Sequence, residues 1–122
     1  MADTINSREL WDHVGGDRAL MSELLELFRR DYPSQIQAAR EALRRADAEG
    51  VENVGHSLKG ALASLAATVA SGLASRLEDT GRSGHLEQTD SILTELEQEL
   101  SRVTASLDIL RQGVSVEDSN CR

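Results

Sequence analysis

The chain has 122 residues, of which 39% are hydrophobic and 2% aromatic, and a formal net charge of −8 at pH 7. This length suits one domain with a single core, and the abundance of Leu, Ala, Glu and Arg favours an all-helical fold. The acidic balance lacks the dense basic stripe of a nucleic-acid binder and disfavours anionic membranes, and no apolar run reaches the roughly 18 residues of a membrane span. Without a signal-peptide core, and with Cys121 as the single cysteine, the sequence predicts a cytoplasmic protein.

The first half of the chain predicts a short helix followed by a long one. Asn6 or Ser7 is expected to cap the short helix, which closes at the glycine pair 15–16. Asp17 caps the long helix, which Pro33 is expected to kink or restart. One face of this helix carries apolar residues at the i, i+4, i+7, i+8 spacing: Leu20, Leu24, Leu27 and Phe28.

The second half predicts three further helices. The first spans about residues 51–67 and ends at a break near Thr68. A second helix follows it, and the TGRSG segment at 80–84 is typical of a loop. The last helix carries a heptad seam, in which apolar residues are separated by three or four positions: Leu93, Leu96, Leu100, Val103, Leu107 and Leu110.

Each predicted helix has one apolar stripe, which it cannot bury alone, and short connections favour antiparallel packing of sequence neighbours. We therefore expect an all-α, antiparallel up-and-down four-helix bundle with the short N-terminal helix as a lid. Residues 1–112 would form this single domain, and residues 113–122 a flexible C-terminal tail. A long coiled coil is the alternative, but only the last helix sustains a heptad.

The stretch VGHSLKGALASLA places a histidine, a lysine and a glycine on one turn of a helix that otherwise resembles core. At about 100° per residue, the apolar side chains of this helix fall within one arc of roughly 100°: Val51, Val54, Leu58, Ala61, Leu62 and Leu65. His56 falls about 170° from the centre of that arc and should face solvent. Lys59 and Gly60 follow as its surface neighbours, and Ala63 and Ala67 continue this outer face.

These residue types suit phosphoryl chemistry. An exposed imidazole offers a nitrogen lone pair near neutral pH, and Lys59 supplies a positive charge for phosphate oxygens. A glycine inside a helix costs about 1 kcal/mol relative to alanine, so Gly60 indicates close approach by another molecule. The sequence has neither a Gly-rich phosphate loop nor a kinase signature, so the phosphate donor and any Mg²⁺ must come from a partner.

The other two histidines receive structural interpretations. His13 is expected at the end of the first helix, and His85 in or just after a loop, where it is solvated. Neither has companion ligands at metal-binding spacing, so no metal site is predicted.

Two arginines are candidates for a basic rim around His56. If the chain turns near Gly50, Arg44 should lie level with His56, and Arg76, across the following turn, level with Lys59. Such a rim would attract an acidic partner surface, although ordinary solvated charges explain these arginines equally well.

The residues His56-Ser57-Leu58-Lys59-Gly60 resemble the His-x-Leu-Lys-Gly signature of histidine-containing phosphotransfer (HPt) domains. The resemblance covers about residues 7–110. Ser64 occupies a position where the family often carries Asn or Ser, and LASRLEDTGRSG resembles the helix and loop that follow. One departure is Ala66-Ala67, where the family usually has Gly-Ala.

The resemblance implies a phosphorelay carrier with no kinase activity of its own. His56 would accept a phosphoryl group from a receiver-domain aspartate and pass it to a second receiver domain. Lys59 would neutralise the phosphoryl charge and Gly60 would give the partner access. Expected partner contacts are Ala63, Ser64, Ala67, Arg44 and Arg76.

Its implied partners are response-regulator receiver domains, with a hybrid sensor histidine kinase as a further candidate. No cofactor is expected on this chain, because the Mg²⁺ would belong to the receiver, and the bundle should be a monomer. The alternative function is a non-catalytic helical module that binds or sequesters a receiver without phosphotransfer. A stand-alone carrier and a piece of a larger kinase both fit the sequence.

Overall fold

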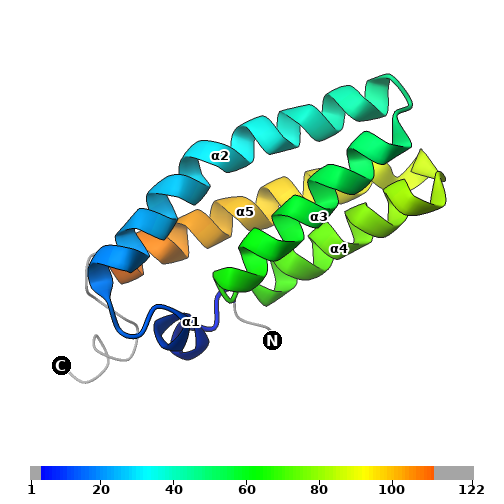
Figure 1. The fold of residues 1–122 in the computed structure, drawn as a ribbon. Helices are drawn as coiled ribbons and strands as arrows, with labels where there is room; N and C mark the ends of the chain where they lie inside the picture. The colour runs from blue at the N-terminus through cyan, green and yellow to red at the C-terminus, as the bar shows by residue number, and fades with distance from the viewer. Residues whose placement is uncertain (1–3, 112–122) are drawn as a thin grey trace.

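The computed structural model describes residues 4–111, and within them the chain is helical without a strand. The elements follow in the order α1 (Ser7–His13), α2 (Arg18–Arg44), α3 (Ala48–Ser64), α4 (Thr68–Ser83), the 3₁₀ turn η1 (Leu86–Gln88) and α5 (Thr89–Arg111). Each long helix packs on its sequence neighbour, and α5 closes the bundle against α2. Figure 1 shows these four helices running alternately up and down, with α1 across one end. The predicted fold class is confirmed.

Some predictions fall on parts of the chain that the structure does not describe. The expected tail at 113–122 and Cys121 lie outside the described residues. Within residues 4–111, none of the helices is both long and apolar enough to cross a membrane.

Helix α1 covers one end of the bundle, as the sequence predicted. Asn6 caps it by accepting a hydrogen bond from the Glu9 amide at 3.0 Å, and the Asn6 amide itself donates to the Ala66 carbonyl at 3.0 Å. Leu10 of this helix is fully buried. The lid is therefore fixed to the turn between α3 and α4.

The long helix α2 differs from its prediction in two ways. It runs from Arg18 to Arg44 without restarting at Pro33. Of the four residues predicted on its apolar face before Pro33, only Phe28 is buried; the buried residues are Met21, Leu25, Phe28, Ile36, Ala39 and Ala42. Before Pro33 the buried face is shifted toward Met21 and Leu25, because one continuous helix buries the face that stays apolar along its whole length. Leu20 and Leu27 are consequently exposed.

The boundaries of α3 are shifted by three residues from the prediction. Asp47 caps the helix by accepting from the Gly50 amide at 3.0 Å, so α3 begins at Ala48 and ends at Ser64. Ala66 has a left-handed backbone with φ of 57° in the turn that follows. Ala61, expected on the core face, is exposed.

The predicted loop at 80–84 is wrong, because α4 continues to Ser83 and ends at Gly84 with φ of 78°. Gly81 is a buried helical residue packed on α3. A Cβ built on it would lie 2.3 Å from the Glu52 backbone nitrogen, and one built on Gly55 would lie 2.4 Å from the Glu78 backbone nitrogen. These two glycines therefore permit α3 and α4 to approach more closely than side chains would allow.

The predicted leucine seam of α5 is confirmed. Its six apolar residues from Leu93 to Leu110 are all buried against the other helices. This seam forms one wall of the core, and the outer surfaces of α3 and α4 remain free to carry polar groups.

Candidate functional site

The imidazole of His56 points outward from α3, as predicted. Its side chain is 73% exposed, and its Nδ1 lies 2.9 Å from Oε2 of Glu78 on α4. One edge of the ring is therefore held by the protein, and the edge that carries Nε2 is left for a partner.

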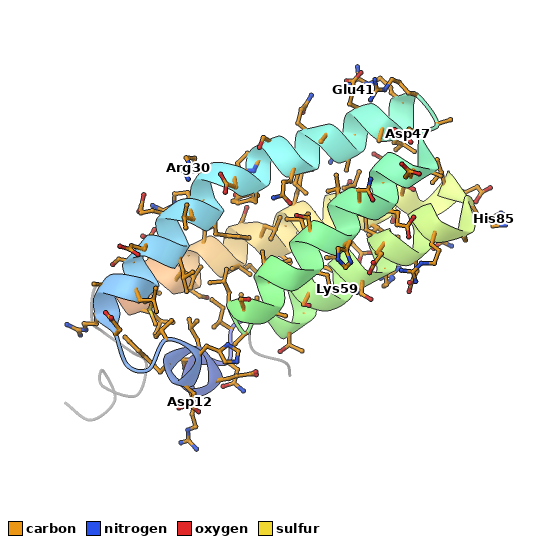
Figure 2. All side chains as sticks on the ribbon, viewed as in Figure 1. Asp12, Arg30, Glu41, Asp47, Lys59 and His85 are labelled. Carbon is orange, nitrogen blue, oxygen red and sulfur yellow. The ribbon has the colours of Figure 1, made fainter. Side chains whose placement is uncertain are left out.

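Lys59 and Gly60 adjoin this ring on the next turn of α3. The Lys59 ammonium donates to Oε1 of Glu78 at 2.6 Å, and its side chain is 38% exposed. Figure 2 shows Lys59 midway along α3, on the flank beside α4. A Cβ built on Gly60 would meet no atom within 4 Å, so this glycine keeps open the surface beside the imidazole.

Glu78 is the central site residue that sequence reasoning missed. Its side chain is 5% exposed, and its two oxygens accept hydrogen bonds from Lys59, His56 and Arg82. The bond from Lys59 and then that from His56 hold the pKa of this carboxyl below the ordinary glutamate value. A sequence signal existed, because Glu78 directly follows Leu77 within the buried stripe of α4.

The protonation of the His56 ring follows from this partner. Because the Glu78 carboxylate stays ionised, it can only accept a hydrogen bond. Nδ1 must therefore carry the proton in the neutral ring, which leaves the lone pair on the outward Nε2. The lone pair of the neutral ring is therefore on the nitrogen that faces away from Glu78.

The close approach of α3 and α4 explains why a buried carboxylate can reach an exposed histidine. Gly55 precedes His56 and packs against the backbone of Glu78. Because the two backbones are in contact there, the Glu78 side chain begins close to α3 and can reach His56. A larger residue at Gly55 would separate the helices and draw the carboxylate away from the ring.

Arg82 completes the polar cluster, and its role was also missed. It lies one turn beyond Glu78 on α4, and its Nη2 donates to Glu78 Oε2 at 3.2 Å. Because residues 80–84 were predicted as a loop, Arg82 was not expected on the helix face beside the histidine.

Three of the expected partner contacts lie elsewhere than predicted. Ala67 is fully buried, because the chain has already left α3 and turned toward α4. Arg44 is the last residue of α2, and the turn at 45–47 places His56 roughly 12 Å further along α3. Arg76 lies 3.8 Å from Glu95 and therefore faces α5. The predicted rim formed by these two arginines is wrong.

Ala63 and Ser64 are exposed on the outer face of α3, toward the lid. The Ser64 hydroxyl donates to the Gly60 carbonyl at 3.2 Å, and its own carbonyl lies 3.1 Å from Nδ1 of His13. His13 is thus the helix-end residue that the sequence predicted. His85 is exposed before η1, at the end of the bundle opposite α1 (Figure 2).

An apolar groove of about 230 Å³ lies between α2 and α3, on the flank of α3 that faces α2. Leu27, Phe28 and Tyr32 line it from α2, and Leu58 and Ala61 line it from α3. Within residues 4–111, no three His, Cys, Asp or Glu side chains are grouped so as to hold a metal ion.

These features define a helical bundle with an exposed imidazole that is held by a buried carboxylate, beside a lysine, an arginine and the open space at Gly60. Residues 23–106 match the Hpt domain family, and the chain belongs to that family. The crystal structure of histidine-containing phosphotransfer protein B from Pseudomonas aeruginosa PAO1 shares the fold, with a TM-score of 0.85. The two chains are 23% identical over 94% of this chain and 100% of that chain. No curated protein sequence matches the chain significantly.

Proposed function

We propose that this chain is a phosphorelay carrier that accepts a phosphoryl group on His56 Nε2 from a receiver-domain aspartate and passes it to another receiver. The observation that carries this proposal is the outward imidazole whose Nδ1 is bonded to the buried Glu78 carboxylate at 2.9 Å. Membership of the Hpt domain family supports it.

The chemical step needs little beyond this geometry. The Nε2 lone pair attacks the phosphorus of an aspartyl phosphate, and a nitrogen–phosphorus bond forms as the bond from phosphorus to the aspartate oxygen breaks. The leaving electron pair stays on the aspartate carboxylate. The ring keeps its Nδ1 proton and becomes positively charged, which the adjacent Glu78 carboxylate stabilises.

The return step reverses these roles. A second receiver's aspartate attacks the phosphorus, and the neutral imidazole leaves with its electron pair on Nε2. Glu78 keeps the ring oriented in both directions because its hydrogen bond lies on the nitrogen that does not react. Any Mg²⁺ in the transfer would be held by the receiver, so this chain needs to supply only the nucleophile and the positive charge.

Lys59 and Gly60 have separate parts in this proposal. The partly exposed ammonium of Lys59 can reach phosphoryl oxygens that project beyond the ring, where it neutralises their charge. Gly60 leaves room for the receiver's backbone to approach the phosphorus.

We expect the receiver to dock along the outer faces of α2 and α3. Leu20 and Leu27 are 38% and 46% exposed, and an apolar groove lies between these helices. Exposed leucines and a groove offer apolar area that binding would remove from water. Ala63 and Ser64 would lie at the edge of this contact.

The test is transfer of labelled phosphate from a phosphorylated receiver domain to the purified chain. We expect acid-labile, base-stable label on the wild type, and none on His56→Gln. His85→Gln is the matched control, because it removes an exposed histidine at the far end of α4 and should label normally.

Two results would contradict the proposal. Label that persists on His56→Gln would show that another residue is the acceptor. Binding of the phosphorylated receiver without label on the wild type would favour the non-catalytic interaction module.

A further inference from the structure

Arg82 lies among three carboxylates. Its Nε lies 3.3 Å from Glu52 on α3, its Nη1 lies 3.4 Å from Asp79, and its Nη2 lies 3.2 Å from Glu78. The side chain is 59% exposed. The pairs with Glu52 and Asp79, whose side chains are 32% and 67% exposed, are weak because water and salt screen them, so the guanidinium can leave these two partners at little cost.

The same guanidinium lies next to the reactive ring. Arg82 Nη2 and His56 Nδ1 bind the same oxygen of Glu78, so the two nitrogens are at most about 6 Å apart. The Lys59 ammonium binds the other oxygen. The Glu78 carboxylate thus gathers an ammonium, an imidazole and a guanidinium at one small site.

A phosphoryl group on Nε2 would change the charge of this cluster. It brings close to two negative charges beside the ionised Glu78, and Lys59 alone cannot balance them. A guanidinium binds phosphate oxygens through two parallel N–H groups, which is a stronger arrangement than its long contacts with surface carboxylates. The second cation within reach is Arg82.

We propose that Arg82 is a second phosphate-binding residue, which leaves Glu52 and Asp79 and donates to the phosphoryl oxygens once His56 is phosphorylated. This inference rests on the proposed function. Glu52 and Asp79 then compete with the phosphoryl group for the guanidinium. Arg82 stabilises the phosphorylated carrier, whereas Glu52 disfavours that state because it competes for the guanidinium.

Because of this competition, two substitutions that break the same ion pair should shift the phosphoryl equilibrium in opposite directions. Arg82→Gln should shift the phosphoryl equilibrium toward the receiver by roughly 5-fold, since a charge-assisted bond to phosphate is lost. Glu52→Gln should shift it toward the carrier by roughly 2-fold, because a weak competitor is removed. If the ion pair had only a structural role, both substitutions would act in the same direction.

The experiment mixes each carrier with a labelled, phosphorylated receiver and measures the fraction of label on each protein at equilibrium. Arg82→Lys should retain part of the effect, because it keeps the charge and loses the planar fork. Arg102→Gln is the matched control, since Arg102 is 62% exposed and pairs with Glu99 on α5. It should leave the equilibrium unchanged.

A second readout follows the guanidinium itself. The Arg82 side-chain nitrogen resonances should shift when the wild type is phosphorylated, and the Arg102 resonances should not. Unchanged equilibrium in Arg82→Gln, or equal shifts in the same direction for Arg82→Gln and Glu52→Gln, would overturn this inference. Failure of the wild type to accept label would instead overturn the proposed function.

Discussion

Charged side chains bridge two pairs of helices in this bundle, and the acceptors of the two sets of ion pairs differ in burial. Between α2 and α5, Arg29 lies 2.7 Å from Asp108, and Arg40 pairs with Asp90 and Glu97. Between α3 and α4, the bridges converge on Glu78. The acceptors on α5 are between 37% and 75% exposed, whereas Glu78 is 5% exposed.

The difference shows how burial of one partner changes the role of an ion pair. On α2 and α5, both partners lie at the surface above a sealed leucine seam, so the pairs only add to the contact between helices. On α3 and α4, the glycine contacts bury the acceptor while the imidazole stays in solvent. A buried carboxylate can orient a donor such as His56, whose ring still remains accessible to a partner.

The largest expected effect comes from closing the cleared surface beside His56. Gly60→Leu should retain the fold, because its side chain would point into open space. It should lower the transfer rate by roughly 100-fold, since the receiver's aspartate can no longer approach in line with Nε2. Transfer of labelled phosphate measures the rate, and thermal unfolding of the same variant shows whether the fold is retained.

Gly72→Leu is the control for this substitution, because Gly72 is another exposed helical glycine, and a Cβ built on it would meet no atom within 4 Å. It should transfer at the wild-type rate. Equal losses in both variants would show that access beside His56 is not the cause.

The next effect concerns the glycine contact between α3 and α4. Gly55→Ala should destabilise the fold by about 1–3 kcal/mol, because its Cβ meets the backbone of Glu78. Gly60→Ala should have the opposite sign and stabilise the helix by about 0.5–1 kcal/mol. Urea unfolding measures both, and a neutral Gly55→Ala would disprove the close helix contact.

Removal of the charge on Glu78 should lower the transfer rate by roughly 10-fold, because the ring loses a charged hydrogen-bond partner. The substitution is Glu78→Gln. Since the pKa of Glu78 is depressed in the folded chain, its stabilising effect is present at neutral pH and is lost as pH falls through that lowered value.

The stability advantage of the wild type over Glu78→Gln should therefore shrink below about pH 4.3, the ordinary glutamate value. Unfolding curves for both proteins between neutral and acid pH provide the measurement. An advantage that grows on acidification would contradict the lowered pKa.

The smallest effect should come from the surface bridges of the other helix pair. Arg40→Gln should change the free energy of unfolding by no more than about 1 kcal/mol, because its pairs are exposed to water. Phosphoryl transfer should be unchanged. A loss of transfer in this variant would mean that the two helix pairs are coupled.

Local periodicity was enough to predict the bundle, the leucine seam and the direction of His56. Each of these depends on the repeat of one helix, and an error of a few residues at its ends leaves the exposed face unchanged. Lys59 and Gly60 followed because they share a helix with the histidine.

Contacts between helices could not be read in the same way. The turns lie at 45–47 and 65–67, about three residues before the expected breaks, which moved Arg44 away from His56 and buried Ala67. Because consecutive helices run antiparallel, a shifted turn changes which residues lie level by about twice the shift, which is roughly 12 Å for Arg44 and His56. Glu78 and Arg82 depend on how closely α4 approaches α3, which is set by Gly55 and Gly81 in packing that no single helix pattern reveals.

The most direct test of the central claim is nitrogen NMR of the His56 ring in the unphosphorylated chain near neutral pH. In the neutral ring we predict the proton on Nδ1, where Glu78 accepts it, and after phosphorylation the phosphorus on Nε2. A neutral ring protonated on Nε2, or phosphorus bonded to Nδ1, would contradict the account.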